Sequence, residues 1–306
     1  MDLDLLLAGY YQEGWCEFEF RLNSPMLISK QSRMPGSIWC GQDLEGKHLL
    51  IWCEQGLGDT IQFLRFIKLV AVEAEEISLL CPDRLKPLLK TFDDSVNVLD
   101  QSDIINNVDF NTPLMSLPFS LGITEIFDPG PYLSAEDSLV IKWSKFFGLP
   151  NKPRIGISWQ GNPAYEADHQ RSIPLFHLRP LLLNKNYEFI SLQQGFGCEQ
   201  ISEFVDQLAV LDDKVDKFAA FTDTAAIIRN LDLVITSDTA IAHLAGALGA
   251  KVWVLLPATP DWRWLLDRDD SPWYSNMLLF RQKESGVWAE VVAQVELALS
   301  KLDSEL

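Results

Sequence analysis

The sequence predicts an α/β protein with two doubly wound parallel sheets that face each other across a cleft. Buried-strand patterns alternate with helical patterns twice along the 306 residues, and 47% of these residues are hydrophobic, which permits a sizeable core. A chain of this length corresponds to about two domains, at roughly 150 residues each. The clearest unit covers residues 232–257, where two β-branched runs flank a helix with apolar residues at positions i, i+3, i+4 and i+7. Such a βαβ unit has parallel, largely buried strands.

Residues 1–46 are the least regular part of the chain and are predicted to form a linker or capping segment over the first domain. Residues 5–21 indicate a short helix. Residues 24–46 are rich in Gly, Pro and Ser, which is typical of extended chain.

A glycine-containing loop, EQGLGD at 54–59, joins the first predicted strand to the first apolar helix. Gly56 and Gly58 let the backbone approach a ligand closely, and Asp59 or Thr60 is placed to cap the helix. The loop is not GxGxxG, so a dinucleotide-binding fingerprint is absent, and a simple helix cap is the alternative interpretation of Asp59.

Prolines punctuate the chain between 113 and 153 and place a domain boundary within 129–153, which separates domains at 47–150 and 151–306. A connecting helix is expected around 138–147. The first domain is expected to contain strands at 48–53, 77–80, 96–99 and 110–117, with helices at 60–74 and 84–90. The second is expected to contain strands at 154–160, 188–192, 233–236, 252–256 and 277–280, with helices at 175–183, 199–207, 222–230, 241–248 and 287–302.

The helix of the 232–257 unit starts at Asp238 or Thr239, either of which suits an N-cap, and Gly249 suits its end. Free N–H groups and the macrodipole at such a start favour an anion by about 0.3–1 kcal/mol per interaction. His243 lies one turn further, and because helical side chains lean toward the N-terminus its imidazole can help hold a phosphate. The alternative is a packed histidine in a unit that binds nothing, which is the commoner case in α/β proteins.

The charge of the chain argues against two classes of partner. Its 43 acidic and 25 basic residues give a net charge of −18, without a Lys/Arg cluster, so binding to nucleic acid or to an anionic membrane is not expected. The five cysteines are scattered without metal-ligand spacing and fit a reducing cytoplasm. Because no apolar run reaches membrane-spanning length and the first residues lack the basic start of a signal peptide, a cytoplasmic location is predicted.

Several strings in order resemble glycosyltransferase family nine, the heptosyltransferase group. They are EQGLGDTIQF at 54–63, ISWQGNPAYEADHQRSIPL at 157–175, FISLQ at 189–193 and SDTAIAHLAGALG at 237–249. The strings at 9–21, 261–274 and 279–282 are more similar to the branch that forms the C-terminal domain of bacterial tetratricopeptide-repeat proteins. The resemblance covers the chain from Gly9 to about Leu299.

This resemblance implies a GT-B fold, in which a Rossmann-like acceptor domain at 47–150 faces a Rossmann-like nucleotide-sugar-binding domain at 151–306. It implies an inverting, metal-independent transfer of a sugar from a nucleotide-sugar donor to a hydroxyl acceptor, which is a glycan, a lipid-linked sugar or a protein. No cofactor is expected besides the donor. The alternatives are a sugar-nucleotide epimerase of the same architecture and a catalytically degenerate domain that binds nucleotides or scaffolds partners.

The resemblance also assigns roles to residues. Asp59 matches the position of the proposed general base, and Arg171 falls in the loop that places a basic residue on the donor phosphates, although Arg171 could instead pair with Glu166 or Asp168. The predicted donor-binding residues are Arg171, Gln193, Glu199, Asp238, Thr239, Ala240, Ile241 and His243, and the loop near the acceptor or phosphate contributes Gln55, Gly56 and Gly58. An inverting transfer needs one base and positive groups beside the leaving diphosphate, and these residues supply both without a metal.

Ala240 departs from the heptosyltransferase motif, which has glycine at that position. Its methyl group would narrow the approach of backbone to a diphosphate, which leaves open whether ADP-heptose is the donor. Among the remaining candidates, the acidic run at 267–270 is interpreted as a solvated loop, and Asp168 with His169 lacks further metal ligands. Four tryptophans are expected to build an interdomain core rather than to stack on a sugar: Trp262, Trp264, Trp273 and Trp288.

Overall fold

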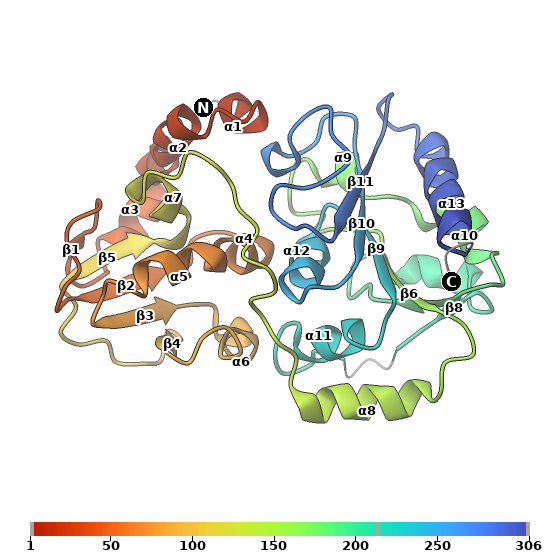
Figure 1. Ribbon diagram of the computed structural model, residues 1–306, viewed down its shortest axis with the longest axis horizontal. Helices are drawn as coiled ribbons and strands as arrows, with labels where there is room; N and C mark the ends of the chain where they lie inside the picture. The colour runs from red at the N-terminus through yellow and green to blue at the C-terminus, as the bar shows by residue number, and fades with distance from the viewer. Residues whose placement is uncertain (1–2, 212–214, 304–306) are drawn as a thin grey trace.

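A computed structural model describes residues 3–211 and 215–303 and shows two α/β domains side by side. In Figure 1 the N-terminal domain runs from red to yellow, and the C-terminal domain from green to blue. Each domain contains one parallel sheet with helices packed against it, as the sequence predicts. In the part of the chain that is described, no helix is long and apolar enough to cross a membrane.

The N-terminal sheet has the strand order β1-β5-β2-β3-β4. Its central strand, β2, is buried along its whole length and pairs Ile51 with Leu79 on one side and with Thr112 on the other. Continuous apolar strands of this kind are expected where helices cover both faces of a sheet. The strands are β1 (Ser37–Ile38), β2 (His48–Trp52), β3 (Glu76–Leu80), β4 (Val96–Leu99) and β5 (Phe110–Pro113).

The C-terminal sheet has the strand order β11-β10-β9-β6-β7-β8. Its chain order reverses between β6 and β9, and a ligand site in an open α/β sheet is expected where the order reverses, at the carboxyl ends of the strands. The strands are β6 (Arg154–Ser158), β7 (Glu188–Ser191), β8 (Leu208–Ala209), β9 (Leu233–Ser237), β10 (Val252–Leu256) and β11 (Met277–Arg281).

Several predicted helices are shorter or more irregular than expected. The helix expected at 60–74 begins earlier, at Leu57, and is broken into three pieces, and the one expected at 199–207 is a 3₁₀ turn. The N-terminal helices of the structure are α1 (Asp4–Leu7), α2 (Tyr11–Phe18), η1 (Glu19–Asn23), α3 (Pro25–Gln31), α4 (Leu57–Phe63), η2 (Leu64–Phe66), α5 (Ile67–Val70), η3 (Asp83–Leu85), α6 (Lys86–Leu89), η4 (Leu114–Ser116) and α7 (Leu117–Ser120). The later ones are α8 (Asp137–Phe147), α9 (Asp168–Arg171), η5 (Leu175–Leu178), α10 (Arg179–Leu182), η6 (Cys198–Glu203), α11 (Thr222–Ile228), α12 (Ala240–Ala247), η7 (Trp262–Trp264) and α13 (Ala289–Asp303).

The segment before residue 47 is built into the fold. The helix expected at 5–21 is divided at Gly9, whose φ of +82° glycine adopts without strain. Helix α1 contacts η7 of the C-terminal domain, α2 contacts α7, and β1 adds an edge strand to the N-terminal sheet. This segment therefore contacts both domains.

Aromatic rings and a buried arginine form the interface between the two domains. The Trp15 ring lies 6.1 Å from the Phe63 ring of α4 and 5.5 Å from the Trp262 ring of η7. Arg65, which is fully buried, donates to the carbonyl oxygen of Trp273 at 2.5 Å. Trp262, Trp264 and Trp273 share the hydrophobic core that spans both domains, as expected.

Trp288 differs from this expectation, because it packs in the separate core between the C-terminal sheet and α13. The expected connecting helix is α8, which packs against α11 of the C-terminal domain, so the chain crosses between domains before α8. There the N–H groups of Tyr132 and Leu133 donate to the carbonyl oxygen of Ala247.

Candidate functional site

A cleft of about 420 Å³ lies between the domains, where α4 of the N-terminal domain meets α12 of the C-terminal domain. It opens at the carboxyl ends of β6 and β9, where the sheet topology places a ligand. Ten of the predicted residues line it: Gly56, Gly58, Asp59, Arg171, Gln193, Asp238, Thr239, Ala240, Ile241 and His243.

Asp59 lies at the third position of α4, not at the cap that the sequence suggested, because the helix begins at Leu57 with Gly56 as its N-cap. The Asp59 carboxylate reaches back, and Oδ2 accepts a hydrogen bond from the Gly56 N–H at 2.8 Å. Its Oδ1 accepts a hydrogen bond from Arg263 Nη2 at 2.5 Å, across the domain boundary. The side chain remains 23% exposed, so the carboxylate is oriented and still accessible from the cleft.

Gly58 marks the closest approach of the two helices. A Cβ atom at this position would lie 3.2 Å from Ala240 Cα, 3.2 Å from His243 Cδ2 and 3.5 Å from Ala240 Cβ. The Ala240 methyl group therefore occupies the space beside Gly58. Glycine at 58, rather than at 240, permits the contact between the two helix starts.

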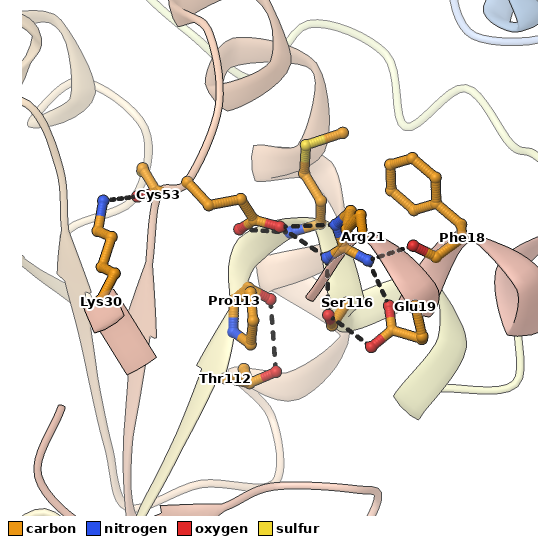
Figure 2. Close-up of polar contacts among 10 residues, drawn as sticks. Phe18, Glu19, Arg21, Lys30, Cys53, Thr112, Pro113 and Ser116 are labelled. Carbon is orange, nitrogen blue, oxygen red and sulfur yellow. Dashed lines mark hydrogen bonds and ion pairs between the residues drawn. The ribbon is translucent and has the colours of Figure 1, made fainter. Parts of the chain in front are cut away.

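The loop between β2 and α4, which leads to Asp59, is anchored by residues of the N-terminal segment (Figure 2). The buried Glu54 carboxylate accepts hydrogen bonds from Arg21 Nη2 at 2.6 Å and from Arg21 Nε at 3.2 Å. Burial raises the pKa of Glu54, and the Arg21 guanidinium opposes this rise. Lys30 Nζ donates to the carbonyl oxygen of Cys53 at 2.5 Å. The end of β2 is thus held by α3 and η1.

The start of α12 meets the cleft with Thr239 as its N-cap residue. The Thr239 hydroxyl lies 3.3 Å from Thr236 Oγ1 and does not bond to the first helical N–H groups. The Ala242 N–H already donates to the Thr239 carbonyl oxygen at 3.0 Å, so the N–H groups of Ala240 and Ile241 are the ones available to an anion.

Asp238 precedes this helix and is 7% exposed. Its pKa is raised to about 6, first by burial and then by the neighbouring Asp261 carboxylate, while the Arg171 cation opposes the rise. A buried carboxyl group of this kind accepts or donates hydrogen bonds to hydroxyl groups of a ligand.

His243 is buried in the second turn of α12, with its ring stacked on Trp264 at 5.5 Å and Nδ1 3.3 Å from the Tyr274 hydroxyl oxygen. Burial lowers its pKa well below the usual range, and the positive charges of Arg263, Arg65 and Arg171 lower it further. The imidazole is therefore neutral at pH 7, and it can contribute one hydrogen bond to a phosphate but no charge.

Arg171 forms one of the ion pairs that the sequence left open and also faces the cleft. Its Nε donates to Asp168 Oδ1 at 3.1 Å, and its guanidinium carbon lies 4.7 Å from the centre of the Tyr165 ring. The side chain also lines the cleft and is 24% exposed. One carboxylate and one ring thus orient a cation that faces the cleft.

Three predicted residues play other parts. Gln193 lines the cleft, but its amide is bonded to Ser158, to the backbone of 159 and 160 and to the carbonyl of Phe196, so it shapes the cleft wall. Gln55 and Glu199 are exposed and lie outside the lining of the cleft. Their predicted contacts with a ligand have no counterpart in this cleft.

Two charged residues that the sequence did not single out also line the cleft, Asp261 and Arg263. Arg263 is 7% exposed and bonds to Asp59, Asp261 and Gln62. Both lie in the string DWRW at 261–264, where a basic residue between two tryptophans is the only signal of a buried cation. Within residues 3–211 and 215–303, no group of three or more His, Cys, Asp or Glu side chains is arranged to hold a metal ion.

Comparisons with known proteins agree on the architecture. No family model matches the chain. The protein FlbA of Caulobacter vibrioides is 29% identical over 321 residues, and the alignment covers 96% of this chain but 53% of FlbA, so the chain spans about half of that relative. A family-nine glycosyltransferase from Veillonella parvula superposes with a TM-score of 0.59 at 12% identity, over 79% of this chain and 88% of that one.

The ADP-heptose lipopolysaccharide heptosyltransferase II of Escherichia coli superposes with a TM-score of 0.55 at 13% identity, over 85% of this chain and its own full length. Identities this low establish shared architecture rather than shared activity. The two parallel sheets, their order and the cleft between them therefore give this chain the GT-B-like fold of the family-nine glycosyltransferases.

Proposed function

We propose that the protein is a glycosyltransferase that moves a sugar from a nucleotide-sugar donor to a hydroxyl acceptor, with inversion and without a metal. The observation that carries this proposal is that Asp59 of one domain and the start of α12 of the other line the same cleft. The first supplies a base and the second a site for an anion. The architecture shared with heptosyltransferases supports the proposal.

In the proposed reaction, the donor diphosphate lies at the start of α12, beside Arg171 and the neutral His243. The acceptor hydroxyl gives its proton to the Asp59 carboxylate while its oxygen attacks the anomeric carbon from the face opposite the diphosphate. The bond from that carbon to the phosphate oxygen breaks, and its electron pair leaves with the nucleoside diphosphate. Fixed N–H groups and the Arg171 cation stabilise the charge that develops on the leaving group.

The test begins with ADP-heptose, UDP-glucose, GDP-mannose and a CMP-sugar, together with the free nucleotides. A thermal-shift screen identifies the nucleotide that the folded protein binds, because such a ligand raises the melting temperature. Incubation of the bound sugar nucleotide with glycan, lipid-linked and peptide hydroxyl acceptors then measures transfer. Formation of the donor's isomer in the absence of an acceptor would identify an epimerase instead, and binding of none of the nucleotides would favour a scaffold.

The decisive variant is Asp59→Asn, which keeps the shape of the side chain and removes the base. We expect turnover to fall on the order of 10²–10⁴-fold with nucleotide affinity retained, because general-base catalysis contributes about that much. Gln55→Asn is the matched control, since Gln55 lies in the same loop, exposed and outside the cleft. Full turnover in Asp59→Asn would exclude Asp59 as the base.

A further inference from the structure

Arg263 extends from the C-terminal domain into the N-terminal domain. It lies in η7, where its N–H donates to Asp261 Oδ1 at 3.0 Å and its carbonyl oxygen accepts from Trp273 Nε1 at 2.8 Å. Its guanidinium carbon lies 4.3 Å from the centre of the Trp262 ring. The backbone of this arginine is thus fixed on both sides, and its guanidinium lies over the neighbouring Trp262 ring.

The guanidinium bonds in three directions. Nε donates to Gln62 Oε1 at 2.6 Å, Nη1 to Asp261 Oδ1 at 2.8 Å and Nη2 to Asp59 Oδ1 at 2.5 Å. Gln62 and Asp59 belong to α4 of the N-terminal domain, and Asp261 belongs to the C-terminal domain. A planar fork with donors at fixed angles satisfies all three acceptors only when the two domains are in this relative position.

Asp59 is restrained from both domains as a result. Its Oδ2 is held by the Gly56 N–H at the start of its own helix, and its Oδ1 is held by Arg263. The first bond leaves the carboxylate free to turn about the axis of that contact, and the second fixes its plane. Each oxygen keeps a lone pair that can accept a proton from a hydroxyl group.

Neighbouring carboxylates compensate the positive charge of Arg263. Asp59 and Asp261 both bond to it, and these carboxylates raise the pKa of Arg263 although its burial acts in the opposite direction. Arg171, by contrast, pairs with Asp168, and its side chain is 24% exposed against 8% for Arg263. Arg171 is therefore the better cation for a diphosphate, and Arg263 is the better holder of a carboxylate.

We infer that Arg263 is a positioning residue that orients the Asp59 carboxylate from the opposite domain, so that the base is aligned only while the two domains are closed. This inference rests on the glycosyltransferase function proposed above, in which Asp59 is the base. It predicts that the contribution of Arg263 to turnover passes through Asp59 and not through binding of the nucleotide.

The experiment compares Arg263→Gln and Arg263→Lys with the unchanged protein, using the sugar nucleotide turned over in the panel and its free nucleotide. We expect kcat to fall on the order of 10²-fold in Arg263→Gln, as a misplaced reactive group does, with KM and nucleotide affinity unchanged. Arg263→Lys keeps the charge but not the fork, so it should recover only part of the loss. Arg268→Gln is the matched control, because Arg268 pairs with Asp270 on an exposed loop.

The double variant Asp59→Asn/Arg263→Gln decides how the residue acts. We expect it to turn over no more slowly than Asp59→Asn alone, because the group that Arg263 orients is already absent. Independent, multiplying losses in the two single variants would overturn the inference. A parallel fall in nucleotide affinity in Arg263→Gln would overturn it as well, because it would make Arg263 a phosphate ligand.

Two further measurements keep the inference testable if Arg263→Gln does not fold or if no donor is turned over. Gln62→Met removes the acceptor of Arg263 Nε with little change in shape, outside the cleft lining, and should lower kcat with KM unchanged. Unchanged kcat in this variant contradicts the inference. If the unchanged protein turns over no donor, the proposed function fails. The contact between Asp59 and Arg263 is then tested by denaturant unfolding of Asp59→Asn, Arg263→Gln and the double variant. If the losses of stability in the two single variants add up to the loss in the double variant, the two side chains are not coupled, which contradicts the inference.

Discussion

At the scale of single residues, burial changes the chemistry that residue type alone suggests. His243 is the clearest case. Its position on α12 led the sequence analysis to predict a contact with a phosphate, but its protonation state depends on surroundings that only the fold supplies. The stack on Trp264 and the nearby arginines keep the imidazole neutral. In the donor site proposed above, the positive charge beside the diphosphate is therefore assigned to Arg171.

A buried neutral histidine makes stability depend on pH. Because the pKa of His243 is lower in the folded state than its ordinary value of 6.5, the unfolded chain binds the proton first as the pH falls. The effect of His243 on stability is absent above pH 6.5. Below pH 6.5, the free energy of unfolding falls by up to about 1.4 kcal/mol per pH unit.

The measurement is the free energy of unfolding by urea between pH 7.5 and 5.5, in the unchanged protein and in His243→Gln. We expect the difference between the two to shift in favour of the variant as the pH falls below 6.5. His169→Gln is the control, since His169 is exposed. The comparison also removes the opposite effect of Asp238, whose raised pKa stabilises the folded state as the pH falls below about 6. A constant difference across this range would show that His243 titrates normally.

At the scale of elements, the packing of α4 on α12 sets the width of the cleft. The sequence indicated a glycine loop and a helix start in two separate domains, and the structure places them in direct contact at Gly58. The methyl group of Ala240 fills the space that Gly58 leaves. Gly58 thus leaves room for the Ala240 methyl group on the facing helix.

Gly58→Ala is expected to force the two helices apart. The new methyl group would meet Ala240 Cα and His243 Cδ2 at 3.2 Å, which is closer than ordinary contact, and both belong to a packed helix. We expect a loss of about 1–3 kcal/mol in the free energy of unfolding, as overpacked sites show. Gln55→Ala, in the exposed loop just before α4, should change stability by less than about 0.5 kcal/mol. Equal stability of the two variants would mean that the helices separate without cost.

At the scale of the whole molecule, the segment before residue 47 joins the two domains rather than covering one of them. Trp15 of α2 packs against Phe63 and Trp262, which belong to different domains. Arg21 and Lys30 hold the end of β2, next to the loop that carries Asp59. The segment therefore links the relative position of the domains to the geometry of the cleft.

Trp15→Ala tests this link. Removal of a fully buried indole costs about 3–5 kcal/mol, and here the cavity would lie at the interface between the domains. We expect calorimetry to show a lower melting temperature and two transitions in place of one, with earlier proteolytic cleavage within residues 3–31. Phe20→Ala, at an exposed position of η1, is the control and should melt like the unchanged protein. A single transition at an unchanged melting temperature in Trp15→Ala would show that the segment before residue 47 does not couple the two domains.

Local patterns were sufficient for much of the fold. The β-branched runs around α12 predicted β9 and β10 within a residue or two, because buried parallel strands need continuous apolar side chains. The helix expected at 60–74 was less well predicted, because apolar periodicity does not reveal that the chain tightens into 3₁₀ turns where Arg65 must reach Trp273. The sequence likewise predicted one helix over residues 5–21, but the positive φ of Gly9 divides this segment into separate helices.

The sequence by itself determined the α/β class, the two domains and ten of the residues that line the cleft, because strand burial, helix starts and glycine loops are encoded within a few consecutive positions. Only the tertiary structure decided that Arg263 holds Asp59, that His243 is neutral and that Gln193 shapes the wall of the cleft. Each of these depends on groups brought together from distant parts of the chain. Partners separated by 204 positions, as Asp59 and Arg263 are, leave no periodic signal in one sequence.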